Sequence, residues 1–299
     1  MSTTAQTPVS GTPEPAPEVV RVTVPKRSLA SELRAIRIVW RRDLIRFAND
    51  RIRIASSLVQ PLLFLFVMGS GLQRLSSAGT HGVNLKTFIY PGVLCITVMF
   101  TAMFSAASIV WDREFGFMRE MLVAPVGRSS IVIGKCLGGA TVASSQGIIM
   151  ILLAGLVHVP YDPLLILGIF GLQLVLAFSI TAFGVMLAAR MKQMQSFFGV
   201  MQMIVTPMFF ISGALFPATG LPGWLTVLNR LDPLTYAVDP MRRLVFDHLS
   251  HVSPAAKAAL DSGVTWWGWR VPGLLEVGIV LVMGLLMLGI AIWEFSTSE

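Results

Sequence analysis

Six long apolar runs, nearly free of charge, divide the chain. They cover residues 54–72, 88–110, 131–157, 163–189, 197–216 and 271–293. Each run reaches the roughly 20 residues that a helix needs to cross the hydrocarbon core of a bilayer. The runs are continuous rather than alternating, which favours helices over barrel strands. The pattern predicts an all-α polytopic membrane protein in which residues 54–299 form a single six-span domain.

The region before the first span has a different pattern. In residues 28–53, apolar side chains recur at steps of three and four, with arginines between them. This spacing predicts an amphipathic helix that lies along an anionic lipid surface; an ordinary helix docked on a partner is the alternative. Residues 1–27 are rich in Pro, Thr, Ser and Ala and lack the apolar core of a secretory signal. We expect them to form a disordered cytoplasmic tail.

Composition supports a membrane protein, because hydrophobic residues make up 54% of the chain and charged residues 13%. Soluble domains contain about 25% charged residues. The formal net charge of +7 is interpreted as a sign of topology rather than of nucleic-acid binding, since Lys and Arg gather on the cytoplasmic side of a membrane. They crowd residues 28–53 and follow spans two and four. Both termini are therefore expected to be cytoplasmic, and the loop before span six external.

The sequence contains no clear catalytic or metal-binding pattern. The nearest approach to a phosphate-binding loop, GRSSIVIGKC at residues 127–136, has the wrong spacing and ends in Cys. The four histidines form no metal-ligand pattern, and Cys95 and Cys136 both lie within apolar runs. We therefore expect a chain that is not an enzyme, has no ATPase site of its own, and binds no cofactor or metal.

The connection between spans two and three, WDREFGFMREMLVAPVGR at residues 111–128, carries many charges of both signs. Residues 114–124 can form about three helical turns with Phe115, Met118 and Leu122 on one face, and Pro125 would end them. The pattern predicts a short amphipathic helix that projects from the cytoplasmic ends of both spans. A routine loop whose charges keep it out of the bilayer is the alternative.

Two segments carry a resemblance to a known family. The stretch DREFGFMREMLVAPVGRSSIVIGK resembles the signature between spans two and three of type-2 ABC exporter permeases, with an Arg-Glu-x-Gly core at residues 113–116, Glu-x-Leu at 120–122 and Pro125. The stretch NRLDPLTYAVDPMRRLVF, residues 229–246, is similar to the family's element between spans five and six. The resemblance covers nearly the whole chain after Pro25 and is closest to the daunorubicin-resistance subgroup. The basic residues that this family usually carries after its last span are absent here.

The resemblance implies the membrane subunit of an exporter in the bacterial cytoplasmic membrane, moving a hydrophobic or amphipathic substrate. ATP and Mg²⁺ would be bound by a separate ATPase dimer, and a second permease, another copy of this chain in the simplest case, would complete the transporter. Export of a lipid-linked glycan or other envelope precursor is one alternative, and an ATP-independent membrane enzyme or scaffold is another. The short helix would be the coupling helix, which meets the ATPase. Its contact residues would be Arg113, Glu114, Phe115, Gly116, Phe117, Met118, Arg119 and Glu120.

The resemblance also implies two re-entrant half-helices within residues 221–249 that close the external exit. The second would begin at Pro240, since proline suits the first turn of a helix. The expected gate residues are Pro233, Tyr236, Asp239 and Arg242. Candidates for a substrate path or for the seam with the second permease are Gln60, Gln202, Met203 and Phe209. For this last group we favour packing over recognition.

Span three has two further features. Gly139, Ala143 and Gly147 recur every four residues, which predicts a face that allows close helix approach. Lys135 lies near the inner boundary and is expected to extend its ammonium group toward water.

Overall fold

The computed structural model describes residues 28–71, 85–117, 126–215, 222–249, 263–266 and 268–297. Six helices in this part of the chain are long and apolar enough to cross a membrane, which confirms the all-α, six-span prediction. They are α2 (Arg51–Leu63) continued by η1 (Phe64–Met68) and α3 (Gly69–Gly71), α5 (Leu85–Glu114), α7 (Arg128–Leu152), α8 (Pro163–Arg190), α9 (Met194–Ile211) and α13 (Gly273–Thr297). The predicted tail 1–27 and three predicted contact residues, Met118, Arg119 and Glu120, lie outside the described residues.

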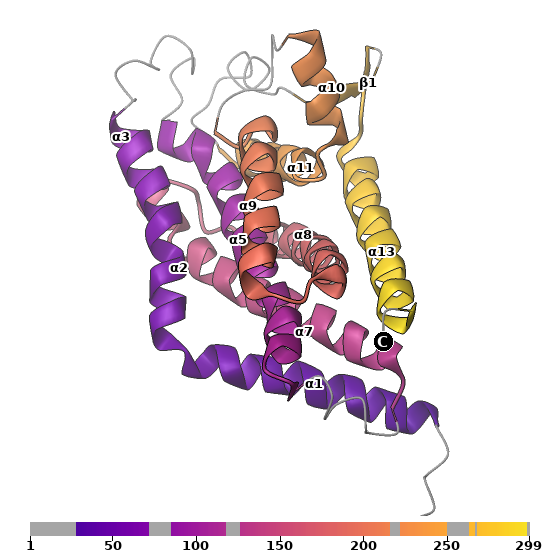
Figure 1. Cartoon of the computed structure of the whole chain (residues 1–299). Coiled ribbons are helices and arrows are strands. Elements are labelled where there is room, and N and C mark those ends of the chain that lie inside the picture. Colours follow the sequence, from indigo (N-terminus) through magenta and orange to yellow (C-terminus); the bar gives the residue numbers. More distant parts are fainter. Residues whose placement is uncertain are drawn as a thin grey trace, which may run out of the picture.

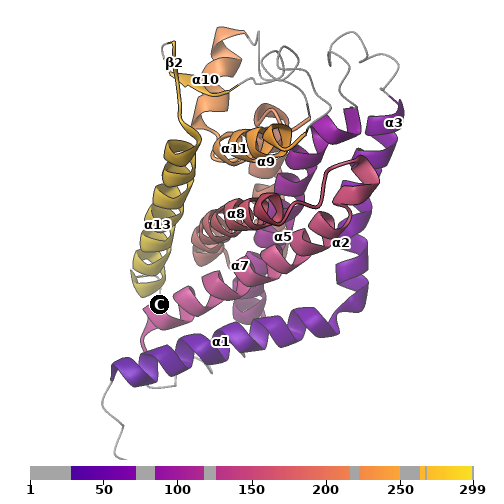
Figure 2. The same ribbon diagram turned by 180° about the vertical axis from the view of Figure 1, so that it is seen from behind.

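The elements outside the six spans lie toward the two ends of the bundle. Helix α1 (Leu29–Asn49) runs across one end, whereas α10 (Gly223–Leu231) and the hairpin of β1 (Thr265–Trp266) and β2 (Trp269–Arg270) lie at the other (Figures 1 and 2). We call these the α1 end and the α10 end. Helix α11 (Thr235–Asp247) follows α10, and a single turn, η2 (Ala154–Val157), follows α7.

Helices α1 and α2 meet in an elbow at Asp50. The Asp50 carboxylate accepts a hydrogen bond of 3.0 Å from the backbone N–H of Arg53, so it caps the start of α2. The backbone N–H of Asp50 itself bonds the carbonyl of Phe47 at 3.1 Å. One aspartate therefore ends the first helix and begins the second.

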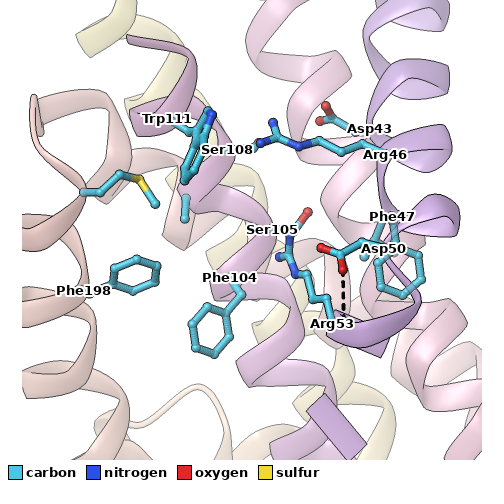
Figure 3. Close-up of a pocket in the computed structure, with 13 residues that line it drawn as sticks. Asp43, Arg46, Phe47, Asp50, Arg53, Phe104, Ser105, Ser108, Trp111 and Phe198 are labelled. Atoms are coloured by element: carbon cyan, nitrogen blue, oxygen red, sulfur yellow. Dashed lines mark hydrogen bonds between the residues drawn. The ribbon is translucent and has the colours of Figure 1, made fainter. Parts of the chain in front are cut away.

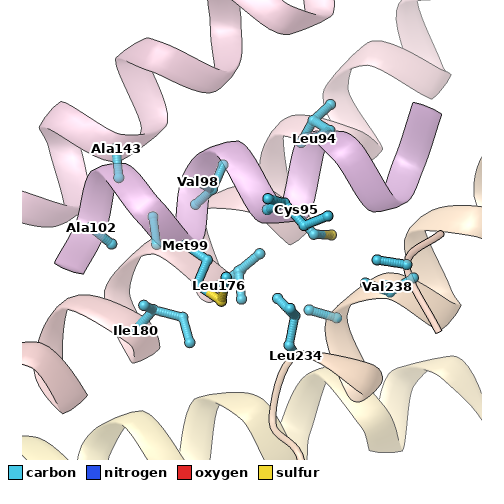
Figure 4. Close-up of a cluster of buried hydrophobic side chains, with 14 of the residues drawn as sticks. Leu94, Cys95, Val98, Met99, Ala102, Ala143, Leu176, Ile180, Leu234 and Val238 are labelled. Atoms are coloured by element: carbon cyan, nitrogen blue, oxygen red, sulfur yellow. The ribbon is translucent and has the colours of Figure 1, made fainter. Parts of the chain in front are cut away.

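Helix α5 is the centre of the bundle. In its most apolar window 83% of the residues are buried inside the protein, against 17% for the first span and 22% for α9 and for α13. Figure 4 shows part of the core, in which α5 packs against α7, α8 and the start of α11. The residues labelled there are Leu94, Cys95, Val98, Met99, Ala102, Ala143, Leu176, Ile180, Leu234 and Val238. The first span, α9 and α13 thus present apolar faces that the described part of this chain leaves largely uncovered.

Small residues of α7 allow its neighbours to approach closely. A Cβ atom placed on Gly147 would lie 1.5 Å from Nε2 of Gln173 in α8, and one on Gly139 would lie 2.5 Å from Cγ2 of Thr181. On another face of α7, a Cβ on Gly134 would lie 2.9 Å from Cβ of Val39 in α1. The close approach predicted from the glycine spacing is confirmed, and α1 also uses it.

Candidate functional site

The connection between α5 and α7 leaves the bundle at the α1 end. Helix α5 continues through Glu114, and the N–H of Gly116 bonds the carbonyl of Arg113 at 3.2 Å. Gly116 has a φ of +83°, a conformation that glycine adopts without the steric cost of a side chain, so it ends the helix. The sequence predicted that a separate helix starts at Glu114. That prediction is wrong by about one turn, because Glu114 is the last residue of α5 and helical backbone resumes only at Phe117.

Arg113 joins the end of α5 to the end of α8. Its guanidinium Nη1 donates to the carbonyls of Ala188 (3.2 Å), Ala189 (3.0 Å) and Met191 (2.7 Å). The last carbonyls of a helix have no partner within the helix and carry partial negative charge, so a cation stabilises them. Arg113 therefore caps α8 from a neighbouring helix.

Glu114 acts on the next helix in the same way, with the opposite charge. Its Oε2 accepts a hydrogen bond of 2.9 Å from the backbone N–H of Met194, the first residue of α9. The first N–H groups of a helix carry partial positive charge, so a carboxylate placed beside them is stabilising. Two consecutive residues thus hold the turn between α8 and α9 to the end of α5.

The far side of the connection is held by α1. Both carboxylate oxygens of Glu32 accept from the backbone N–H of Gly127, at 2.9 and 3.0 Å, and one also accepts from Oγ of Ser130. Gly127 is the N-cap of α7 and has no side chain with which to cap it, so Glu32 supplies the acceptor from another helix. Glu32 was not predicted from the sequence. Its only signal is that it is one of two acidic residues, with Asp43, in a helix rich in arginine.

Aromatic side chains are exposed beside these caps. Phe115 is 57% exposed and Phe117 50% exposed, and the ring of Phe115 stacks on Trp111 at 4.7 Å. Exposed phenylalanines on a polar turn are unfavourable in water and suit a protein contact. Of the eight predicted contact residues, Arg113 and Glu114 therefore hold the bundle together, whereas Phe115 and Phe117 point outward.

A buried ionic cluster lies just inside the connection. Nζ of Lys135 is 2.7 Å from Oδ2 of Asp112 and 3.3 Å from Oδ1 of Asp43, and it donates to Oγ of Ser108 at 3.0 Å. The Lys135 side chain is 1% exposed. The expectation that it extends toward water is wrong, because two carboxylates from α1 and α5 surround it inside the protein. Arg42 completes the cluster at 2.7 Å from Asp112.

At the α10 end, α10 and α11 form the expected pair of short helices. Helix α11 begins at Thr235 and carries Pro240 in its interior. The predicted start at Pro240 is therefore wrong. The turn before α11 is held by Asp232 instead. Its Oδ1 accepts a hydrogen bond of 2.9 Å from the backbone N–H of Leu234, the residue just before the helix. Burial raises the pKa of the Asp232 carboxyl to about 7.

Three of the four predicted gate residues hold this end together. Arg242 is buried, donates to the carbonyl of Gly213 at 2.6 Å and lies 4.4 Å from the ring centroid of Phe88. The hydroxyl of Tyr236 donates to the carbonyl of Arg230 at 2.7 Å and accepts from Nε1 of Trp266 at 3.0 Å. Pro233, the fourth, lines an apolar cavity of about 220 Å³ between α8, α9 and α13.

Asp239 belongs to a second buried ionic cluster. It pairs with Arg243 and accepts from the N–H of Val264 at 3.1 Å. Arg243 also lies 3.3 Å from Oε1 of Glu276, a fully buried carboxylate in the first turn of α13. The sequence analysis missed Glu276, although it is a lone acidic residue in a predicted span. The sequence does not show that Arg243, on another helix, is its partner.

The four residues proposed for a path or seam are divided. Gln60, Gln202 and Met203 are exposed on α2 and α9, and Nε2 of Gln202 donates to Thr206 one turn away at 2.8 Å. Phe209 is buried, and its ring centroid lies 5.3 Å from that of Phe64. Phe209 therefore joins α9 to the first span, and the other three face outward.

The sequence of this chain is similar to those of known proteins. A family model described as ABC-2 type transporter matches residues 34–246. A protein named putative transport permease ycf38 from Cyanophora paradoxa is 31% identical over 220 residues, which cover 71% of this chain and 74% of that protein. Nodulation protein J from Rhizobium leguminosarum bv. viciae is 26% identical over 250 residues, covering 81% of this chain and 92% of the relative.

Proposed function

This chain belongs to the ABC-2 type transporter permease family, and we propose that it is the membrane subunit of an ABC exporter that moves a hydrophobic or amphipathic substrate out of a bacterial cell. Permeases of this family work with a separate ATPase. We place the ATPase contact at the connection between α5 and α7, and the α1 end in the cytoplasm with both termini. The excess of Lys and Arg at this end supports the orientation.

One observation carries the proposal, namely that both flanks of this connection are tied to other helices by charge-assisted hydrogen bonds. Arg113 and Glu114 bind the turn between α8 and α9 at 2.7–3.2 Å, and Glu32 binds the start of α7 at 2.9–3.0 Å. Such bonds are about twice as strong as neutral ones. A push on Phe115 or Phe117 by an ATPase would therefore act on α5, α8 and α9 through one flank and on α7 and α1 through the other, which a loosely attached loop could not do.

At the other end we propose that α10 and α11 re-enter the outer leaflet and close the exit. Arg242, Asp239 and Tyr236 each bind a partner within the protein, as is expected of polar groups near hydrocarbon. Opening would have to break these contacts, which fits a gate that is closed at rest.

We further propose that a second copy of this chain covers the exposed apolar faces of the first span and α9, with Gln60, Gln202 and Met203 toward the seam. Substrates of the multidrug type suit the Met-rich cavity beside Pro233, which Met208, Met283 and Met287 also line. Export of a lipid-linked glycan is the alternative. It is less favoured because the whole chain has three Tyr with which to line a sugar path.

The test is reconstitution of the permease with its ATPase in liposomes, measuring ATP hydrolysis with and without an amphipathic substrate. Phe117→Ala should leave basal hydrolysis unchanged and reduce the substrate-stimulated part at least fivefold. Trp269→Ala, which removes an equally exposed ring (53%) from β2 at the α10 end, is the matched control and should change the stimulated rate less than twofold. Full stimulation in Phe117→Ala would refute the contact. A membrane enzyme or scaffold would show no ATPase dependence in any variant.

A further inference from the structure

Two adjoining cavities flank the elbow between α1 and α2. One has a volume of about 330 Å³ and the other about 300 Å³. Phe47, Arg53 and Phe104 line both, so the two adjoin between the elbow and α5, and we treat them as the two halves of one site. One half lies at the level of α1 and the other follows α2 toward the middle of the bundle.

The half beside α1 is the more polar of the two and offers cations. Figure 3 shows the guanidinium groups of Arg46 and Arg53 pointing from the elbow toward Ser108 and Ser105 of α5. Arg46 is held loosely, 4.0 Å from Oδ1 of Asp112 and 5.4 Å from the centroid of the Trp111 ring. The Arg53 guanidinium has an electrostatic interaction with Asp50 but makes no hydrogen bond or ion pair within the described part of the chain.

The two acids of this half are already engaged by the protein. Asp43 lies against Lys135 at 3.3 Å, and Asp50 caps α2 through the N–H of Arg53 at 3.0 Å. The two guanidinium groups therefore remain available to an anion. Oγ of Ser105 also has no hydrogen-bond partner among the described residues, and a hydroxyl can donate to the same anion.

The half beside α2 is mainly apolar, although Arg53 and the amide of Gln60 also line it. Its hydroxyls donate to carbonyls of their own helices: Ser56 to Arg53 at 3.1 Å, Ser57 to Ile54 at 2.9 Å and Thr101 to Thr97 at 2.8 Å. Because these donors are satisfied, the wall presents mainly hydrocarbon. The apolar lining residues are Phe47, Pro61, Ile96, Phe100 and Phe104.

We propose that this space binds an amphiphile of the cytoplasmic leaflet that has an anionic phosphate headgroup. Arg46 and Arg53 would bind the phosphate at headgroup level, where juxtamembrane arginines attract anionic lipid. One acyl chain would lie between α2 and α5. The site deepens the proposed export function, on which its orientation rests, because it names the headgroup chemistry that reaches the permease from the inner leaflet.

The test measures binding alone, on the full-length chain in detergent by native mass spectrometry. The probes are dioleoyl phosphatidylglycerol, dioleoyl phosphatidylcholine as a zwitterionic lipid, and glycerol 3-phosphate, which has no chain. The double variant Arg46→Gln/Arg53→Gln removes both guanidinium groups. Its matched control, Arg37→Gln/Arg51→Gln, removes the same charge from two exposed arginines outside the cavities. Gln60→Trp, at an exposed position on the rim, obstructs the apolar half.

We expect phosphatidylglycerol to bind about tenfold more weakly to Arg46→Gln/Arg53→Gln, since each guanidinium contributes charge-assisted bonds, and less than twofold more weakly to the control. Gln60→Trp should weaken binding of phosphatidylglycerol and leave binding of glycerol 3-phosphate unchanged. Equal losses in both double variants, binding of glycerol phosphate as tight as that of the lipid, or equal binding of phosphatidylcholine would overturn the proposal. No ATP or ATPase is present, so failure to bind leaves export untouched, and failure of export leaves the binding result standing.

Discussion

Replacing Lys135 by Met removes the ammonium group that joins α1, α5 and α7 but keeps the length of the side chain. The change leaves Asp112 and Asp43, whose side chains are 5% and 6% exposed, without the buried ammonium group that contacts both. Nζ of Lys135 lies 2.7 Å from Oδ2 of Asp112. It lies 3.3 Å from Oδ1 of Asp43, closer than Nε of Arg42 at 3.7 Å. The folded protein should therefore lose stability, whereas a lysine extending toward water could be replaced without effect.

The size of the loss follows from the charges that remain. Removing one partner of a buried ion pair costs about 3–5 kcal/mol when the other is left unpaired. Here Arg42 stays 2.7 Å from Asp112 and 3.7 Å from Asp43, so we expect the lower end, about 3 kcal/mol. At about 2–4 °C per kcal/mol for a protein of this size, Tm should fall by roughly 6–12 °C.

The assay is thermal unfolding in detergent, followed by intrinsic tryptophan fluorescence. Lys192→Met is the control, because Lys192 is exposed after α8 and its removal should shift Tm by less than about 2 °C. Adding Asp43→Asn to Lys135→Met should recover part of the loss, since Asp43, to which Arg42 comes no closer than 3.7 Å, then carries no charge. An unchanged Tm in Lys135→Met would refute the reasoning from burial.

Two further predictions concern other parts of the bundle. Gly147→Ala should destabilise the protein by about 2–3 kcal/mol, because the new Cβ would displace Gln173, whose Nε2 donates to the carbonyl of Ser144 at 3.0 Å. Gly171→Ala is the control, since nothing lies within 4 Å of the Cβ position of Gly171. It should not destabilise the protein in the same thermal assay. For Asp232 the pKa is raised by burial to about 7 in the folded protein, so folding favours the protonated form and stability should fall as pH rises. The fall between pH 5.5 and 7.5 should be about 2 kcal/mol, and a pH series of unfolding curves should lose this component in Asp232→Asn.

The spans were predictable because crossing a bilayer imposes a long continuous apolar run, and such runs are visible in one dimension. The spacing of Gly139 and Gly147 predicted close packing for a similar reason, since residues four apart share one helix face. These features depend on the local sequence alone. They fix the number of helices and one contact face.

The sequence could not show pairings between distant helices. Lys135 seemed close enough to a span boundary to reach water, and only the approach of α1 and α5 brings Asp43 and Asp112 to it. Glu32 and Glu276 were missed because their partners lie on other helices. Gly116 was predicted to lie within a helix that starts at Glu114, but its φ is +83° and it follows the end of α5. A positive φ leaves no periodic signal in the sequence.

The central claim, that the connection between α5 and α7 receives the ATPase, is tested most directly by photo-crosslinking in the assembled transporter. Phe117→benzoylphenylalanine places a crosslinker at an exposed aromatic position of the connection, and Trp224→benzoylphenylalanine places one on the α10 end, where Trp224 is 68% exposed. The account predicts a crosslink to the ATPase subunit from position 117 and none from position 224. Crosslinking from position 224, with none from position 117, would contradict it.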